Sequence, residues 1–418
     1  MRKLTVKNFS VIKEAELEFG KITVLIGPQS SGKSLLCKLA YFLGSEVIDI
    51  AINHVTNQFS FPAFETAVKK EFAKWFPRGG WGTSQFVIVF SSSDYQVTVS
   101  APSQPGQNSE INVKFGATIK HEYIARLAAN AEAKFSDAVR ASGRLLDSLA
   151  QLSFRWMSGR GRADTSVYIP LERSYFVDTK KGYRALASEA DPISAGFAPL
   201  FADSLSRNFS RDRLVRFLRG NLTSGPEGWL FAFDDGRKLP LSELSSGSKE
   251  TLPILSVLDM YENELRQPGW DPASSVRVDE KTYSFDDFTI EEPEASVFPE
   301  TQYELVKEFA ALASGTDFVP RFTITTHSPY TLSSFNNLLE AWQVAAAKPD
   351  AKNDVAKLID ERYWIKPSDF KAYCIHDGQL ESIMDEETGL INGNYLDGVS
   401  SEIGSQFDEL LRIGYVDA

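Results

Sequence analysis

Short apolar or alternating stretches open the chain. Segments 4–9, 15–19 and 22–26 have this pattern, which predicts three short strands. A Gly-rich turn follows the third stretch, and the helical spacing of apolar residues then predicts a helix over about 33–43. We therefore expect a strand, a turn and a helix in direct succession near the N-terminus.

The middle of the chain switches between helical and strand periodicity. Helical spacing covers most of 45–78 and of the Ala-rich stretch 117–158, where no heptad register lasts long enough for an extended coiled coil. Between them, FVIVF, YQVTVS and INVKF have the pattern of strands. We expect a small sheet and a modest helical insertion here.

From residue 166 onward strands and helices alternate, a pattern typical of a largely parallel sheet flanked by helices. The predicted strands are SVYIP, 229–233, 286–291 and FTITT, and the predicted helices include an Arg-rich stretch to about 220 and a segment near 330–347. After 348 the pattern changes to helix with a hairpin near YCIHDGQLESIMD, which we expect to form a separate small unit.

The composition is that of a folded globular protein. The 418 residues are 43% hydrophobic and 24% charged, and they include no repeat, low-complexity tract or 18-residue apolar run. The N-terminus lacks the apolar core of a signal peptide, so we expect a cytoplasmic protein with no membrane partner. Cys37 and Cys374 lack metal-ligand spacing and are expected to be core residues, not a disulfide or a zinc site.

The net charge of -12 argues against a protein coated in positive potential for nucleic acid, but leaves room for a local basic groove. Two Arg-rich segments, 155–162 and 207–219, are candidates for such a groove, which would bind DNA or an acidic protein. For the second segment we favour an amphipathic helix with a solvated basic face. The arginines concerned are Arg155, Arg160, Arg162, Arg207, Arg211, Arg213, Arg216 and Arg219.

The segment GPQSSGKS fits the phosphate-loop pattern G-x-x-x-x-G-K-[ST] and lies between the apolar strand ITVLI and a helix. In this context the loop backbone and helix N-terminus would cradle the phosphates of a nucleotide, Lys33 would reach the β and γ phosphates, and Ser34 would ligate Mg²⁺. The loop alone does not choose among kinases, GTPases, helicases and transporter-type ATPases. A turn that merely caps the helix is the alternative, and the strand–loop–helix order disfavours it. The predicted binding residues are Gly27, Pro28, Gln29, Ser30, Ser31, Gly32, Lys33, Ser34 and Leu35.

Three later segments each have an ordinary explanation when taken alone. LSSGSKE is typical of a Ser-capped helix, FTIEEPEAS of a strand that ends in a solvated acidic turn, and THSPY of a histidine in a cap or core. Their order after the phosphate loop, with His327 following Glu292 by 35 positions, resembles that of ABC-type ATPases.

The resemblance implies a role for each segment. Ser245 and Gly247 would be the signature residues that bind the γ-phosphate of ATP held by another subunit. Glu291 would hold Mg²⁺ through water, while Glu292 would polarise the attacking water and His327 would contact the γ-phosphate as the switch histidine. The implied reaction is hydrolysis of ATP to ADP and phosphate. The sequence assigns no role to Arg173 or Glu294.

EEPEASVFP, THSPY and YIPLERS together resemble the soluble ATPases around SMC, RecF and the overcoming-lysogenization-defect nucleases. They are especially similar to stand-alone ATPases of bacterial antiphage operons of the PARIS type. The resemblance implies an α/β P-loop NTPase fold of ABC-ATPase type, with a mostly parallel sheet flanked by helices, an N-terminal antiparallel β-subdomain and a helical insertion. The expected units are an N-terminal lobe at 1–60, an inserted subdomain at 61–165, a C-terminal lobe at 166–347 and a small subdomain at 348–418.

Several features depart from that family's pattern. NFS replaces the usual NFR, with Lys13 three positions later, and no Asp stands at the D-loop spacing after Glu292. No glutamine loop is assigned, and Gln58 and Gln85 are candidates for it. The residues after His327 are too few for a Toprim nuclease domain, so no nuclease is expected in this chain.

The leading hypothesis is an ATP-driven switch, in which two copies or a larger homo-oligomer close over ATP and reopen on hydrolysis. It would sense an invader and control a separately encoded nuclease or toxin. A RecF- or SMC-like ATPase of DNA repair or maintenance is the alternative and predicts DNA-stimulated hydrolysis. A scaffold in which turnover is incidental is a third possibility, and a transporter subunit is disfavoured by the insertions and the EEPE segment.

Overall fold

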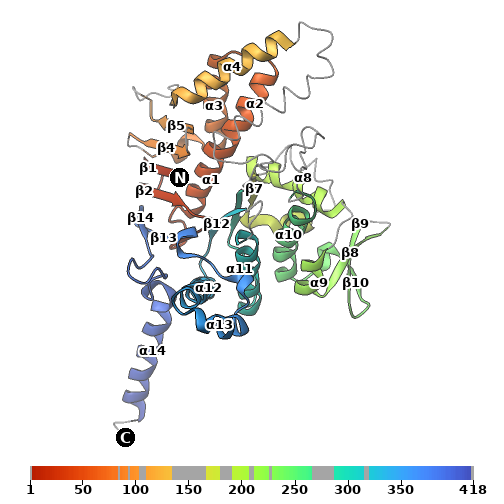
Figure 1. The fold of residues 1–418 in the computed structure, drawn as a ribbon, viewed down its shortest axis with the longest axis vertical. Helices are drawn as coiled ribbons and strands as arrows, with labels where there is room; N and C mark the ends of the chain where they lie inside the picture. Colours follow the sequence, from red (N-terminus) through yellow and green to blue (C-terminus); the bar gives the residue numbers. More distant parts are fainter. Residues whose placement is uncertain are drawn as a thin grey trace.

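The computed structural model describes residues 2–82, 85–92, 95–102, 110–133, 166–178, 191–206, 211–225, 228–265, 287–314 and 320–415. One large sheet of eleven strands runs through the molecule in the order β6-β5-β4-β1-β2-β14-β13-β3-β12-β11-β7 (Figure 1). Its strands are β1 (Arg2–Phe9), β2 (Ile12–Phe19), β3 (Ile22–Ile26), β4 (Val87–Ser92), β5 (Tyr95–Ser100), β6 (Asn112–Phe115), β7 (Ser166–Ile169), β11 (Asp287–Glu291), β12 (Arg321–Thr325), β13 (Phe370–His376) and β14 (Gln379–Ser382).

The sheet has a parallel half and an antiparallel half. Strands β13, β3, β12, β11 and β7 run parallel to one another, whereas β1, β2 and β4 to β6 form an antiparallel meander. The hairpin partner β14 joins the halves, since it is antiparallel to β13 and parallel to β2. The expected α/β class, with parallel strands and an N-terminal antiparallel part, is confirmed.

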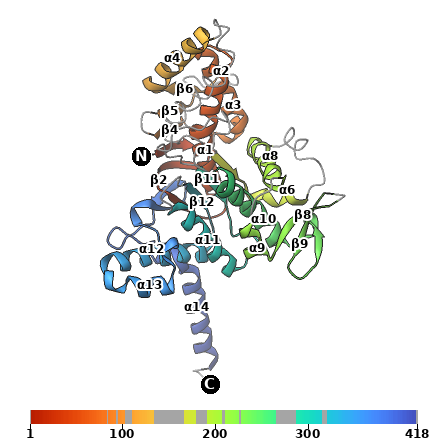
Figure 2. The same cartoon turned by 45° about the vertical axis from the view of Figure 1, so that its right-hand side comes forward.

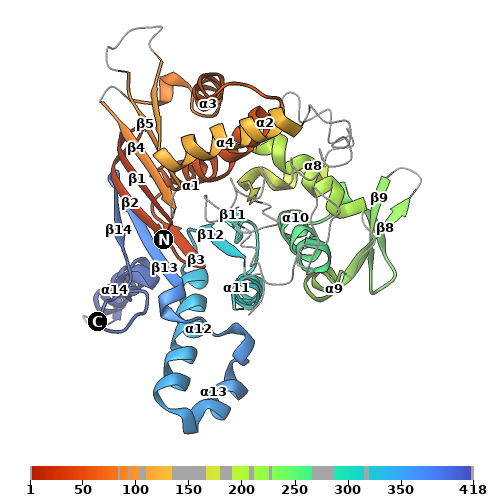
Figure 3. The ribbon, with the colours of Figure 1, turned by 45° about the horizontal axis from the view of Figure 1, so that its top comes forward.

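Helices cover both faces of the sheet because residues along the buried strands alternate between two cores. On β3, Val24 packs in one core and Leu25 in the other. Helices α1 to α4 lie over the Leu25 face, and α8 and α10 to α12 over the Val24 face (Figure 3). Their bounds are α1 (Lys33–Tyr41), α2 (Val47–Thr56), α3 (Phe61–Trp75), α4 (Ala117–Ala133), α8 (Pro192–Ser206), α10 (Ser246–Met260), α11 (Pro299–Ala313) and α12 (Pro329–Ala347).

A second, three-stranded antiparallel sheet lies at one side of the molecule, beside α9 (Figure 2). It consists of β8 (Gly220–Gly225), β9 (Gly228–Phe233) and β10 (Lys238–Pro240), and it follows α9 (Asp212–Leu218) directly. The sequence analysis predicted only the central strand of this sheet. The short helix α6 (Ser174–Asp178) connects β7 to this side of the fold and contacts α10.

The C-terminal residues contribute to the main sheet, contrary to the separate unit expected after 348. Strand β13 pairs with β3, the strand that leads into the phosphate loop. Helix α13 (Lys352–Leu358) packs on α12, and α14 (Asn394–Tyr415) contacts α12 before extending away from the body (Figure 1). Among the described residues, no helix is long and apolar enough to cross a membrane.

The Arg-rich segment at 207–219 is only partly a solvated basic face in its described part, because Arg216 and Arg219 are exposed whereas two other arginines are buried. Arg213 is buried and pairs with Asp259, Glu262 and Glu308, and Arg211 is buried with its guanidinium donating to the carbonyl of Leu205. The side chains of Arg211 and Arg213 are therefore not available to bind DNA. Arg207 and the whole cluster at 155–162 lie outside the described residues.

Candidate nucleotide site

The loop between β3 and α1 has the concave backbone of a phosphate site. Gly27, Ser30 and Gly32 adopt φ angles of 147°, 61° and 112°, the left-handed region that favours glycine. A side chain at Gly27 would place its Cβ 2.3 Å from the carbonyl oxygen of Ile375 on β13. The motif glycines are therefore required by local geometry, and β13 forms one wall of the loop.

Lys33 and Ser34 begin helix α1 at this loop. The Lys33 amino group donates to the carbonyls of Gly27 and Pro28, at 2.9 and 3.0 Å. Burial lowers the pKa of Lys33, and the carboxylates of Glu292 and Glu294 oppose that shift. The lysine therefore lies within electrostatic reach of the acidic strand end, as a phosphate-binding cation requires. Ser34 is exposed.

The strand end after β11 places Glu292 against His327. Glu292 has a φ of 41°, which is strained for a glutamate, and its N–H donates to the carbonyl of Thr325 at 3.0 Å. Its carboxylate oxygen Oε1 lies 3.1 Å from Nε2 of His327, which follows β12. The two predicted catalytic residues are thus in direct contact, because parallel strands β11 and β12 end at the same edge of the sheet.

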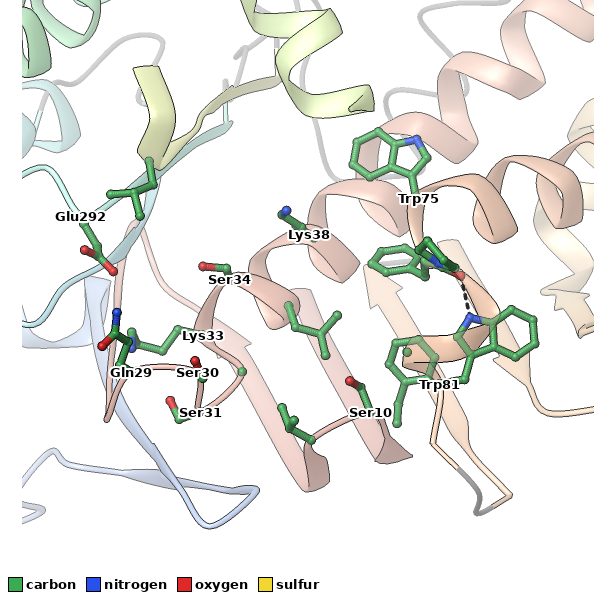
Figure 4. Close-up of a pocket in the computed structure, with 18 of the residues that line it drawn as sticks. Ser10, Gln29, Ser30, Ser31, Lys33, Ser34, Lys38, Trp75, Trp81 and Glu292 are labelled. Carbon is green, nitrogen blue, oxygen red and sulfur yellow. Dashed lines mark hydrogen bonds between the residues drawn. The ribbon is translucent and has the colours of Figure 1, made fainter. Parts of the chain in front are cut away.

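These groups line one cavity of about 520 Å³. Glu292, Gln29 and Lys33 lie at one end of it, and Trp75 and Trp81 at the other (Figure 4). Its lining also includes Ser30, Ser31, Gly32, Ser34, Leu35, Lys38, Leu171 and His327. A cavity of this size is in the range of small-molecule and cofactor sites.

The aromatic end of the cavity was not predicted from the sequence. It comes from the segment WFPRGGW after α3, and it meets the site because the N–H of Ser10 donates to the carbonyl of Trp81 at 2.9 Å. The indole N–H of Trp81 donates to the carbonyl of Phe76, which fixes the turn. Two tryptophans around a Pro-Arg-Gly-Gly turn were the available signal, but only the folded sheet brings them to the phosphate loop.

The carboxylate of Glu291 is buried and hydrogen-bonded, whereas a metal ligand beside the nucleotide was expected to be accessible. Its carboxylate accepts a hydrogen bond from the Tyr168 hydroxyl at 2.8 Å and from the Leu171 N–H at 3.1 Å, and the residue is 5% exposed. It lines a neighbouring cavity of about 290 Å³, which shares Lys38 with the larger one. Its charge also helps raise the pKa of the buried Cys37 thiol, after burial itself, so the carboxylate lies near α1.

Glu294 ties the acidic strand end to the histidine segment. Its Oε1 accepts from the Thr326 hydroxyl at 2.8 Å and from the backbone N–H of His327 at 2.6 Å. Burial raises the pKa of this carboxyl, and the hydrogen bonds oppose the shift. The third acid of EEPE is therefore a buried support, not part of a solvated turn.

The LSSGS segment caps α10 and remains exposed. The Ser245 hydroxyl accepts from the N–H of Ser248 at 3.3 Å, as the capping interpretation predicts. Neither Ser245 nor Gly247 lines the cavity formed by the phosphate loop of the same chain. A Cβ on Gly247 would lie 2.8 Å from the carbonyl oxygen of Ser296, so glycine allows the turn to pack against the loop after Glu292.

Comparison with known proteins supports part of this assignment. Residues 178–332 match the AAA ATPase domain family. The matched region contains the LSSGS, EEPE and THSP segments, whereas the phosphate loop lies before it. No curated protein matches the chain.

Among solved structures, the SMC head domain from Thermotoga maritima aligns over 91% of this chain and 97% of its own, at 10% identity and a TM-score of 0.37. That likeness is too distant to carry an argument about function. The AAA ATPase match and the local geometry of the phosphate loop are thus two separate observations that agree.

The other candidate family positions do not line the phosphate-loop cavity. Lys13 does not line the large cavity, and neither do Gln58 and Gln85, whereas Gln29 of the phosphate loop does. Ser10, which stands at the position of the usual NFR arginine, lines the cavity as a neutral residue. The site therefore lacks a cation at that position.

Proposed function

We propose that this protein binds and hydrolyses ATP, and that nucleotide closes two or more copies of the chain into a switch. The observation that carries the proposal is the convergence of the phosphate loop, Glu292 and His327 on a single cavity. These residues are far apart in the sequence, and their meeting is the arrangement that phosphoryl transfer to water requires.

The phosphate end of the cavity fits a nucleotide triphosphate with Mg²⁺. The left-handed loop backbone and Lys33 would hold the phosphates, while the exposed Ser34 hydroxyl would ligate the metal. Glu291 remains the candidate acidic partner of the metal, since its buried carboxylate lies beside α1. When bound, Mg²⁺ would neutralise charge on the phosphates.

Glu292 and His327 would act on the attacking water. Glu292 is about a quarter exposed in its side chain, at 26%, and can reach solvent in the cavity. Its carboxylate would orient the water or accept its proton, and His327 would hold the carboxylate and contact the γ-phosphate. Phosphoryl transfer depends chiefly on positioning and electrostatics, and this pair would supply the groups of the same chain that act on the water.

The aromatic end would take the nucleobase. Trp75 and Trp81 lie across the cavity from Glu292 (Figure 4). Flat indole rings provide apolar area for a base, and they lie at the opposite end of the cavity from the phosphate loop.

The signature turn supports a switch made of several copies. Ser245 and Ser246 are exposed and lie outside their own chain's cavity, so they are available to a second copy. Exposed apolar residues lie near the site segments: Phe298 is 71% exposed and Tyr330 55%. Phe298 occupies the D-loop position where the expected Asp is missing, and it would contribute contact area between two copies.

The proposed output is control of a separately encoded nuclease or toxin in antiphage defence, and it rests on the sequence resemblance alone. For the alternative of a DNA-repair ATPase, burial removes Arg211 and Arg213 from the candidate DNA groove, whereas Arg216 and Arg219 are exposed. Toxicity on co-expression with a neighbouring nuclease gene would favour the defence role, whereas stimulation of hydrolysis by DNA would favour repair.

The hydrolysis proposal is tested by Glu292→Gln. The amide keeps the size of the side chain but removes the negative charge, so we expect ATP affinity within about twofold of wild type. Turnover should fall by about 100-fold or more, and an ATP-bound dimer or larger assembly should accumulate. ATP binding by calorimetry, phosphate release and mass photometry measure the three outcomes.

The matched control is Glu300→Gln, an identical change on the exposed first turn of α11. It should leave binding and turnover unchanged. Normal hydrolysis by the Glu292→Gln protein would remove Glu292 from the proposed role.

A further inference from the structure

Arg173 is a fully buried arginine at the end of the YIPLERS segment, with 0% of its surface exposed. Its guanidinium donates to three carbonyl oxygens on one side. They belong to Pro170 at 3.1 Å, Glu291 at 2.6 Å and Glu292 at 2.8 Å. The guanidinium thus holds the backbone of both acidic residues at the strand end.

On its other side Arg173 holds the signature helix α10. Its Nε donates to the carbonyl of Glu250 at 2.9 Å and lies 3.2 Å from the Glu250 carboxylate. Glu250 follows Gly247 by three positions, near the start of α10. One side chain therefore bridges the signature turn and the loop that carries Glu292.

A second contact joins the same two segments. Gly247 packs so closely on Ser296 that an added Cβ would lie 2.8 Å from the Ser296 carbonyl oxygen. Ser296 is four residues after Glu292 and, like it, has a positive φ, at 56°. The signature turn thus touches the acidic loop directly, as well as through Arg173.

The strained backbone at Glu292 makes its position depend on this bridge. A non-glycine residue in the left-handed region persists only where its surroundings fix it. The planar guanidinium presents its donors in a rigid fork, so a shift of α10 changes the geometry of the bonds to Glu291 and Glu292. Lysine, a point charge on a flexible stem, cannot hold all of these carbonyls at once.

We propose that Arg173 is a positioning residue that couples the signature helix to the catalytic glutamate of the same chain. The inference rests on the proposed function, in which the signature turn binds the nucleotide of a second copy. Seating of that turn on the partner's nucleotide would set Glu292 in its own site through Arg173. Nucleotide bound in one site would then change the position of Glu292 in the other, so hydrolysis becomes cooperative.

The test compares Arg173→Lys with the wild-type protein in steady-state hydrolysis over a range of ATP concentrations. Wild type should show a Hill coefficient above 1, with a ceiling of about 2 for two coupled sites. In Arg173→Lys the Hill coefficient should fall to about 1 and kcat should drop tenfold or more, since misplacing a catalytic group by about 1 Å costs up to about 100-fold. ATP affinity, measured by calorimetry without turnover, should stay within about twofold.

Arg213→Lys is the matched control. Arg213 is also buried and also bonded to α10, through Asp259, but it makes no contact with the acidic loop among its recorded partners. It should lower thermal stability about as much as Arg173→Lys, yet keep the wild-type Hill coefficient and a kcat within about twofold.

The possible outcomes separate the inference from the function on which it rests. If Arg173→Lys and Arg213→Lys behave alike in Hill coefficient and kcat while Glu292→Gln is inactive, hydrolysis stands and the coupling role is overturned. If wild type does not hydrolyse ATP, or Glu292→Gln hydrolyses it normally, the proposed function itself fails, and the coupling with it.

Discussion

At the scale of single residues, the three glutamates of EEPE have three environments. Glu291 is buried under hydrogen bonds from Tyr168 and Leu171, and Glu292 reaches into the cavity beside His327. Glu294 is largely buried and holds the N–H of His327. The sequence predicted distinct roles for the first two. It gave no role to Glu294, because that role depends on a contact with a residue 33 positions away.

Replacing Glu294 tests its support of His327. Glu294→Ala removes the acceptor for the Thr326 hydroxyl and the His327 N–H, so we expect kcat to fall by about tenfold and ATP affinity to change little. Glu294→Gln keeps an acceptor oxygen and should retain most activity. Phosphate release and ATP binding measure both, and equal activity in the alanine and glutamine variants would contradict a hydrogen-bonding role.

At the scale of elements, α9 shows where periodicity was misleading. The spacing of arginines and apolar residues predicted a solvated basic face, and Arg216 and Arg219 are indeed exposed. However, α9 has only seven residues and packs between α10 and its own sheet. Arg213 turns inward to three carboxylates, Asp259, Glu262 and Glu308. Charge pattern alone does not reveal this, because the acids belong to α11, to α10 and to the turn that follows it.

The same cluster predicts a pH dependence of stability. Burial raises the pKa of Asp259 to about 6, against the opposing charge of Arg213. The folded state therefore holds more protons than the unfolded state between the ordinary value of 3.8 and about 6, and this contribution to stability declines as pH rises through that window. Glu262 and Glu308 also pair with Arg213, which limits how far the arginine lowers the pKa of Asp259.

Asp259→Asn should remove that dependence. Relative to the variant, the wild-type free energy of unfolding should decline by about 1 to 3 kcal/mol between pH 4 and pH 7. Urea denaturation of both proteins at several pH values measures the difference, in which all other titrating groups cancel. A constant difference across this range would contradict the assignment to Asp259.

At the scale of the whole molecule, the sequence predicted the order of the motifs and the fold class better than the assembly of the cavity. Strand-end rules place Glu292 and His327 together, since β11 and β12 are parallel neighbours. No local pattern predicts that β13 enters the sheet beside β3, or that Trp81 reaches the loop at Ser10. Both depend on the long-range order of strands in the sheet.

The central claim is that an ATP site is completed by the signature turn of a second copy. Two variants that we expect to be inactive test it: Lys33→Ala, which removes the proposed phosphate-binding amine, and Ser245→Arg, which would block the proposed signature turn. Each homodimer has two defective sites, whereas a mixed dimer has one intact site, formed by the Ser245→Arg chain's phosphate loop and the Lys33→Ala chain's signature turn.

Phosphate release should therefore be measured for each variant alone and for an equimolar mixture. The account predicts almost no activity for either variant alone and a clear gain on mixing. Half of randomly formed dimers carry one intact site, so about one quarter of the wild-type rate is the ceiling. Coupling through Arg173 lowers this recovery by about tenfold, to a few per cent of the wild-type rate, because the intact site's own signature turn is blocked. A mixture no more active than its components, or full activity of Ser245→Arg alone, would contradict it.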